Sequence, residues 1–301
     1  MALPTSGKLS ILDIVGEFGG TAPHSLSEYY SAAQGVPSSG QLSISDFYGA
    51  ASLFIATISS NQNNVDLRSF ALNEGWDGNS AVEITIESGV IVDSHNTSDP
   101  ALVVDGDFPD DLTIINQGTI VGMGGDGGGE NNDGPGEQGG TALSIVSTNI
   151  MGQLLIDNLG TIAGGGGGGG MGGGPRSGGS GSGGGGGQSS RVNSAGGIKR
   201  LDGANDGEPG TFDSPGQGGE ESGEQVSSDP FVFDSYGAGG DGGPWGTAGE
   251  QGEEGGRTDT ILGFFRTTTN PGLSGGAAGI AVTGFNDVTW VNEGTILGPT
   301  E

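Results

Sequence analysis

The 301-residue sequence contains no cysteine, so its fold depends on no disulfide and on no thiolate chemistry. The first residues, MALPTSGKLSILDIVG, lack a basic region followed by a long apolar run, and no stretch of the chain is long enough to cross a bilayer. We therefore expect neither a secretory signal nor a membrane insertion. An extracellular role would require another route, such as assembly into a particle that is released by lysis.

Basic and hydrophobic residues are both scarce. Lys and Arg together number 8 against 37 Asp and Glu, which gives a formal net charge of −29. A surface this acidic repels phosphate backbones, so we expect no nucleic-acid partner. Hydrophobic residues make up 31% of the chain, which is too little for a large conventional core.

Catalytic and metal-binding patterns are also missing. The two histidines, His24 and His95, stand in polar, loop-like contexts without a convincing nucleophile or acid partner, so we expect no enzyme. The segment GGDGGGENND (124–133) resembles a calcium-binding nonapeptide repeat only weakly, because it lacks the apolar position and the repetition. We expect no metal site and no cofactor, with Ca²⁺ at scattered carboxylates as the one ion to consider.

Glycine is the residue in excess, with 69 copies. The richest runs are 122–140, 164–187, 203–223, 237–256 and 272–279. A flexible linker is the usual interpretation of one such run, but a tether does not need five. The alternative is polyglycine II, an extended helix of three residues per turn whose outward N–H and C=O groups pair with neighbouring helices. Backbone ordering costs roughly 1–2 kcal/mol per residue against about 0.5–1.5 kcal/mol per hydrogen bond, so only a packed bundle is stable.

The first fifty residues repeat a short theme in 8–20, 24–35 and 41–52, in which Leu-Ser precedes an acid and an apolar or aromatic pair. Serine caps and acids in the first turn favour three short helical turns. Two interpretations remain open: a mini-domain whose aromatic residues fill its own core, or a docking module whose aromatic residues a partner covers. The candidate docking residues are Leu9, Ile11, Phe18, Leu26, Tyr29, Tyr30, Leu42, Ile44, Phe47 and Tyr48.

An eleven-residue unit recurs as LTIINQGTIVG (112–122), LLIDNLGTIAG (154–164) and VTWVNEGTILG (288–298), with a looser copy at 84–94. Apolar residues alternate with polar ones, which predicts strands with one buried face, and Asn-x-Gly predicts a bend where both residues tolerate positive φ. A second apolar run precedes each unit, so we expect stacked coils of about two strands each. The scaffold residues singled out are Asn116, Gly118, Asn158, Gly160, Asn292, Gly294, Trp290 and, over the glycine bundle, Trp245.

These patterns predict a mainly β protein: a short β-solenoid or stacked β-layer combined with a polyglycine II helix bundle, behind a small helical module. The expected divisions are 1–52 for the docking module, 53–121 for the first β-layer and 122–301 for strand units interleaved with glycine helices. Within the second division, 63–76 is predicted to be one helix that Gly75 ends.

The N-terminal LSISDFYGA together with the repeated strand units and glycine runs over 75–301 resembles glycine-rich tail-fibre and tail-tip proteins of tailed phages. The arrangement is similar to the distal tail-fibre adhesins of T-even phages. That resemblance implies a virion tail protein that attaches to other tail or fibre proteins, a trimeric fibre among them, and binds a host-surface receptor, a glycan or a protein. The acidity of this chain departs from those proteins.

The resemblance also makes the non-glycine segments 188–202, 224–236 and 257–270 candidate receptor loops on a rigid scaffold. The candidate receptor residues are Phe231, Phe233, Tyr236, Ile261, Leu262, Phe264, Phe265, Arg257 and Arg266. Two alternatives remain: a purely structural tail protein, and a calcium-stabilised secreted β-solenoid.

Overall fold

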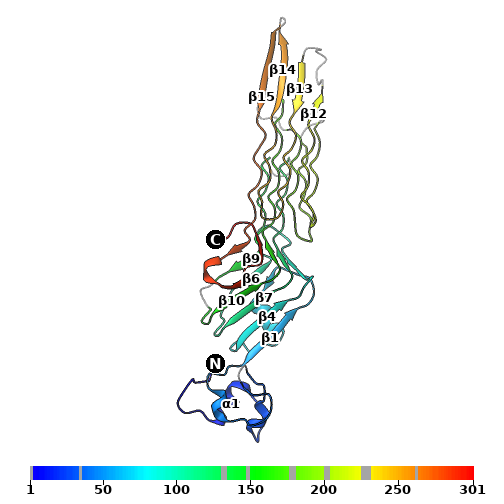
Figure 1. Ribbon diagram of the computed structural model, residues 1–301. Helices are drawn as coiled ribbons and strands as arrows, with labels where there is room; N and C mark the ends of the chain where they lie inside the picture. Colours follow the sequence, from blue (N-terminus) through cyan, green and yellow to red (C-terminus); the bar gives the residue numbers. More distant parts are fainter. Residues whose placement is uncertain are drawn as a thin grey trace.

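The computed structural model describes residues 3–33, 36–129, 134–146, 150–175, 181–199, 204–224, 232–261 and 264–301. The molecule is mainly β and elongated (Figure 1). A small helical module lies at the N-terminal end, stacked parallel strands follow, and rows of extended glycine-rich chain lead to a separate antiparallel sheet at the far end.

The N-terminal module forms a short helix at each of the three repeats, as predicted: α1 (Ile11–Phe18), η1 (Leu26–Tyr29) and η2 (Ile44–Phe47). Ser10 and Asp13 close a capping box at α1, and hydrogen bonds from Ser10 hold the pKa of Asp13 below its ordinary value. The rings of Phe18, Tyr29 and Phe47 pack with centroids 6.2 to 6.3 Å apart. The module therefore has an aromatic core of its own.

The strand units build three parallel sheets: the first two receive one strand from each of five coils, and the third from four of them, among the described residues. The first contains β1 (Leu53–Ile58), β4 (Ala81–Ile86), β7 (Leu112–Asn116), β10 (Leu154–Asn158) and β17 (Thr289–Asn292). The second contains β2 (Gln62–Asn63), β5 (Ile91–Asp93), β8 (Thr119–Val121), β11 (Thr161–Ala163) and β18 (Thr295–Leu297). The third contains β3 (Val65–Asp66), β6 (Leu102–Val104), β9 (Leu143–Ile145) and β16 (Val282–Thr283).

A full coil thus has three strands where two were expected. The Asn-x-Gly bend divides each unit between two sheets, and the apolar run before the unit supplies the third. The predicted inner faces are confirmed: Leu112, Ile114 and Ile120 are buried, as are their equivalents in the next coil. Stacking explains the burial, because each coil covers the apolar edge of the one before it.

The predicted helix at 63–76 is shorter than expected. Residues 62–63 and 65–66 are the strands β2 and β3, and only Leu67–Asn73 forms the helix α2. The reason is tertiary: Val65 pairs with Leu102 and is buried in the coil core. Asp66 then caps the helix by accepting from the N–H of Ser69 at 2.6 Å.

The Asn-x-Gly bend does not use positive φ in its first two copies. Neither Gly118 nor Gly160 has positive φ, although Gly294 does. Glycine is needed there for close approach, because a Cβ on Gly118 would overlap the carbonyl oxygen of Val90. Asn116 and Asn158 are buried and stack, with Nδ2 of the first donating to Oδ1 of the second at 2.8 Å.

Asn292 departs from this stack. The register between β10 and β17 shifts after Ile156, so Asn292 is exposed and its Nδ2 donates instead to Oδ1 of Asp157 at 2.7 Å. The neighbouring Trp290 is half-buried and stacks on Phe285 with centroids 5.0 Å apart. The last coil is therefore a modified end of the stack.

The glycine-rich runs are extended and bonded to one another with a period of three residues. Along 165–173, every third N–H donates to 182–188, the next set to 247–253, and the third set to 134–140, with N···O distances of 2.7 to 3.0 Å. The carbonyl groups of the same nine residues accept, again in rotation, mostly from three further segments: 125–128, 237–243 and 273–279.

The segment 165–173 is consequently surrounded by neighbouring chains on all sides, and its residues are buried. Apart from Met171, whose side chain is buried there, the segment consists of glycines that leave no room for a side chain: a Cβ on Gly169 would overlap the carbonyl oxygen of Gly240. Acidic residues such as Glu137, Glu250 and Glu253 lie on outer segments and are exposed. We call this bonded set of segments the glycine slab; it comprises 122–128, 134–140, 164–174, 181–188, 194–199, 204–210, 216–221, 237–243, 247–253 and 272–279.

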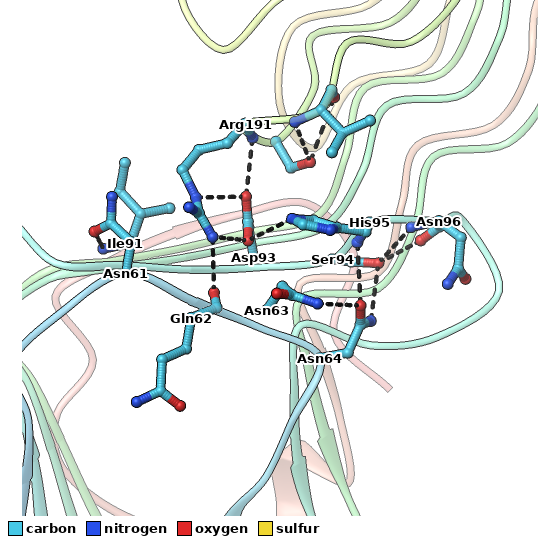
Figure 2. Close-up of polar contacts among 12 residues, drawn as sticks. Asn61, Gln62, Asn63, Asn64, Ile91, Asp93, Ser94, His95, Asn96 and Arg191 are labelled. Carbon is cyan, nitrogen blue, oxygen red and sulfur yellow. Dashed lines mark hydrogen bonds and ion pairs between the residues drawn. The ribbon is translucent and has the colours of Figure 1, made fainter.

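An ion pair with a fully buried carboxylate joins the slab to the coils (Figure 2). Asp93 ends β5 with no side-chain exposure, and Arg191 follows a slab segment. The guanidinium of Arg191 donates to both carboxylate oxygens of Asp93, from Nε to Oδ2 at 2.9 Å and from a terminal nitrogen to Oδ1 at 2.7 Å. The backbone N–H of Arg191 also donates to Oδ2, at 3.0 Å. The same guanidinium donates to the carbonyl oxygen of Gln62 at 3.2 Å. The contacts of Arg191 with Asp93 and Gln62 therefore connect the base of the slab to two successive coils.

Candidate functional site

The far end of the molecule is a four-stranded antiparallel sheet in the order β12–β13–β14–β15, which we call the distal sheet (Figure 1). Its strands are β12 (Ser222–Glu224), β13 (Val232–Tyr236), β14 (Gly255–Ile261) and β15 (Phe264–Asn270). The strands arise because the glycine runs give way to alternating aromatic, Thr and charged residues, which favour pleated pairing.

The slab positions the distal sheet directly. Tyr236 is followed at once by the slab segment 237–243, and β14 begins directly after 247–253. At the junction, the N–H of Gly237 donates to the carbonyl oxygen of Gly173 at 2.8 Å, and Nδ2 of Asn270 donates to that of Gly174 at 2.9 Å. Slab and sheet thus share continuous backbone and hydrogen bonds.

One face of the distal sheet carries its charges. The register places Asp234 opposite Arg257, and Asp259 opposite Arg266. Nε of Arg257 donates to Oδ1 of Asp259 at 2.8 Å, and another nitrogen of its guanidinium lies 3.8 Å from Oδ1 of Asp234. Asp234 is 7% exposed and that oxygen accepts no hydrogen bond, so the arginine is its charge compensation.

The opposite face contains no charged residue on β13, β14 or β15. A row of Phe233, Thr258 and Thr267 crosses the three strands, and the hydroxyl groups of the two threonines are 3.2 Å apart. The next row pairs Thr260 with Phe265. In a chain of net charge −29, an uncharged surface with exposed rings is a candidate contact site.

The strand β15 forms the outer edge and is exposed along nearly its whole length. Phe264 and Phe265 are each 78% exposed, and because they are adjacent in a strand they lie on opposite faces. Phe233 is 54% exposed on the uncharged face. Rings this exposed contribute little to a core, so they are available for contact with another molecule.

The predicted receptor residues divide into three groups. Phe233, Phe264, Phe265, Arg257 and Arg266 come together on the distal sheet. Tyr236 is only 3% exposed and packs at the base of the sheet, so it supports the surface without forming it. Phe231 and Leu262 lie outside the described residues, and of Ile261 only the backbone position in β14 is described.

The first half of the candidate loop at 188–202 lies at the base of the slab and not at the distal end. Residues 188–194 turn at the base of the slab, where Arg191 grips Asp93. Gln188 donates through Nε2 to the carbonyl oxygen of Phe212 at 2.9 Å, and Trp245 donates through Nε1 to that of Ser189 at 2.9 Å. The ring of Trp245 also meets Phe212 edge to face, with centroids 4.9 Å apart. Trp245 therefore covers the base end of the slab.

The candidate docking residues mostly hold the module together. Tyr29 and Phe47 are buried, and Leu9, Phe18, Leu26, Leu42 and Ile44 pack against that core while half-exposed. Tyr30 donates to the carbonyl oxygen of Gly40, and Tyr48 to that of Gly7 at 2.6 Å. Ile11 is half-buried, whereas Leu12, which the repeats did not single out, is 71% exposed. The mini-domain interpretation accounts for the aromatic core, and the surface left for docking is narrower than expected.

The histidines do have acidic neighbours, contrary to expectation. Nε2 of His95 lies 3.6 Å from Oδ1 of Asp93, and Nδ1 of His24 lies 3.4 Å from Oε2 of Glu28. Although Asp93, Ser94 and His95 are consecutive, the hydroxyl of Ser94 donates to the carbonyl oxygen of Asn96 rather than to the imidazole (Figure 2). The carbonyl oxygen of Asp99 also lies within hydrogen-bonding distance of this hydroxyl, at 2.7 Å. The contacts of Asp93, Ser94 and His95 therefore stabilise the turn that follows β5.

A cleft of about 550 Å³ lies at the other end of the molecule, between the N-terminal module and the first coils. Ser52, Leu53, Val82 and Glu83 are among its lining residues. Among the residues that the structure describes, no group of three or more His, Asp or Glu side chains is arranged to bind a metal. Nor does any helix within the described ranges have the length and apolarity that crossing a bilayer requires.

Comparison with known proteins gives two matches. A family model described as phage tail fibre adhesin Gp38 matches residues 53–301. Among solved structures, the chain is similar to one described as the gp37–gp38 adhesin tip complex of the long tail fiber of bacteriophage S16, with 26% identity and a TM-score of 0.56, covering 99% of this chain and 100% of that one. No curated protein matches the chain.

Proposed function

The chain belongs to the Gp38 family of phage tail fibre adhesins and so acts in the virion tail at the host surface, and we propose that its distal sheet makes the contact with the host receptor. The observation that carries this proposal is the exposure of Phe233, Phe264 and Phe265 at the end farthest from the N-terminal module (Figure 1). Rings held on a rigid support bind with little loss of side-chain entropy.

We infer further that the stacked coils are a short β-solenoid and that the slab is a polyglycine II bundle. The rotation of hydrogen bonds among three donor directions and three acceptor directions supports this, because a helix with three residues per turn directs successive groups about 120° apart. Such a bundle is stiff without a hydrophobic core, which suits a chain with few apolar residues.

The N-terminal module is the proposed attachment point to the rest of the fibre. The printed description of the similar S16 structure is of a complex between gp37 and gp38, which supports a fibre protein as the partner here. Three short helices around one aromatic core suit a partner with three chains, and we propose a trimeric fibre tip on that basis. Residues 1–52 form the docking module in this scheme, and 53–121 and 122–301 form the solenoid start and the receptor-presenting part.

Replacement of the two edge rings tests the receptor proposal. Phe264→Ala with Phe265→Ala is expected to lower the adsorption rate of otherwise intact particles at least ten-fold, because each ring buries a large apolar surface on contact. The matched control is Met151→Ala, which removes an apolar side chain that is 83% exposed on the coils. Adsorption is measured as loss of free infectious particles after mixing with host cells.

Two other results are informative. Unchanged adsorption by the double variant would contradict the receptor role of the distal sheet. Particles that fail to assemble with the double variant, while the Met151 control assembles, would favour a purely structural tail protein whose slab and sheet pack against other subunits.

A further inference from the structure

The distal sheet leaves an unusually long strand edge open. The edge strands of the described sheets are β1 and β17, β2 and β18, β3 and β16, and β12 and β15. Five of these have two or three residues, and β17 has four with a register shift beside it. β1 has six, but it begins beside the N-terminal module, where the N–H of Ser52 donates to Oε1 of Glu17 at 2.9 Å. β15 has seven.

Natural proteins usually block such an edge with proline, lysine, a bulge or a covering segment, because unpaired N–H and C=O groups recruit other strands. β15 has none of the first three: its sequence is FFRTTTN, and its seven pairs with β14 run without a register shift. Within the described residues, no backbone hydrogen bond reaches its outer side. An exposed, regular and largely uncharged strand edge promotes aggregation unless a specific partner strand binds to it.

Alternate residues of β15 direct their backbone N–H and C=O groups away from β14, toward the open side of the sheet. In an antiparallel pair, hydrogen-bonded and non-hydrogen-bonded positions alternate, and side chains come closest at the latter. Thr258 and Thr267 form such a close pair, with hydroxyl groups 3.2 Å apart. The outward N–H and C=O groups of β15 are therefore those of Phe265, Thr267 and Thr269.

The side chains along the β15 edge indicate which kind of segment would pair with this strand. Phe264 and Phe265 project from opposite faces at one end, so a strand added there passes between two rings. The β14–β15 hairpin, residues 255–270, holds Arg257, Arg266 and one acid, Asp259, and is net positive in a chain of net charge −29. Arg257 is paired with Asp259, whereas Arg266 makes no ion pair within the described residues. An acidic segment is complementary to this cation.

We propose that β15 binds its receptor by strand addition: an extended, acid-containing segment of a host-surface protein joins the distal sheet as a further strand beside β15. The proposal rests on the receptor role of the distal sheet and specifies the class of receptor. Backbone hydrogen bonds supply affinity in this mode, and the flanking rings and Arg266 supply selectivity.

Thr267→Pro tests the backbone contribution. Proline removes the outward N–H of Thr267, and an edge strand tolerates proline where the N–H faces solvent. The expected result is at least a ten-fold loss of adsorption rate, with both phenylalanines unchanged. Thr267→Val keeps the N–H and a β-branched side chain, so it is expected to lose less adsorption than Thr267→Pro. Met151→Ala on the coils is the control that is expected to adsorb as the parent does.

Amide hydrogen exchange on the parent chain gives a readout that needs no variant. Mixing with cell-envelope vesicles from the host strain is expected to slow exchange at Phe265, Thr267 and Thr269. Treating the vesicles with protease is expected to abolish this protection, and periodate oxidation of glycans to leave it.

The outcomes separate the two proposals. If the phenylalanine double variant loses adsorption but Thr267→Pro adsorbs normally, or if periodate and not protease removes the protection, strand addition is overturned and the receptor role stands. If neither variant loses adsorption, the receptor role itself fails. Loss of adsorption in Thr267→Pro together with protease-sensitive protection of the three amides supports strand addition.

Discussion

At the residue scale, Asp93 and Arg191 connect parts of the chain that lie 98 positions apart. The carboxylate is fully buried, while the arginine side chain remains 33% exposed. A charge taken out of water needs a partner, and the bidentate geometry supplies one together with direction. The pair therefore sets the position of the slab on the coils more than it adds net stability.

The unequal burial of the two side chains predicts unequal effects. Arg191→Met leaves a buried carboxylate with His95 and the backbone N–H of residue 191 but no paired cation from the guanidinium, and it is expected to lower the free energy of unfolding by about 3 kcal/mol. Asp93→Asn leaves a half-exposed arginine and is expected to cost about 1–2 kcal/mol. Combining the two changes is expected to cost less than their sum. Urea unfolding of the three variants measures this, and a smaller loss for Arg191→Met than for Asp93→Asn would contradict it.

At the element scale, the slab is stable because its neighbours approach to backbone hydrogen-bonding distance. The interior glycine positions have no space for a Cβ, although Met171 and Ser182 are buried elsewhere in the slab, while outer positions hold Glu, Gln and Asp. Glycine is thus selected here for its missing Cβ. Its conformational freedom is a cost that the surrounding hydrogen bonds offset.

Gly169→Ala tests this argument. The added methyl group would overlap the carbonyl oxygen of Gly240, so neighbouring segments must separate, and we expect a loss of about 3 kcal/mol or more in the free energy of unfolding. The matched control is Glu250→Ala on an exposed outer position of the same slab, expected to change stability by less than about 0.5 kcal/mol. Thermal unfolding followed by circular dichroism compares the two. Equal midpoints would show that the slab is loosely packed.

At the scale of the whole molecule, the N-terminal module and the distal sheet, the proposed sites of attachment and recognition, lie at opposite ends (Figure 1). The N-terminal module and the coils have separate hydrophobic cores, the first around Ile14 and Phe47 and the second around Ile84 and Ile114. The distal sheet continues from the slab, and the slab is joined to the coils by continuous backbone, by backbone hydrogen bonds and by the ion pair of Asp93 with Arg191.

Separate cores predict separable functions. Deletion of residues 1–52 is expected to leave the thermal unfolding of the remaining chain largely unchanged, because the coil core includes no residue of the module. The shortened protein is expected to be missing from purified particles by immunoblot, since the proposed attachment surface is gone. Its incorporation at the normal level would rule out docking through this module.

The sequence by itself determined the local features of this protein. The alternation of Leu112, Thr113 and Ile114 specifies a strand with one buried face, and Ser10 and Asp13 specify the start of a helix. The glycine runs specify segments that form neither an α-helix nor an ordinary β-strand. Each depends on neighbours within a few positions, so it is readable from the chain alone. The resemblance of the repeated units to tail-fibre adhesins was readable for the same reason.

Only the tertiary structure decided how these pieces meet. Val65 is a strand residue because it pairs with Leu102, and Asn292 lies outside the asparagine stack. Residues 188–194 lie at the base of the slab, and Tyr236 is buried at the base of the distal sheet. Each outcome rests on contacts between residues far apart in the chain, which no local pattern encodes. The open edge of β15 belongs to this second group, because a strand becomes an edge only when the order of the whole sheet is settled.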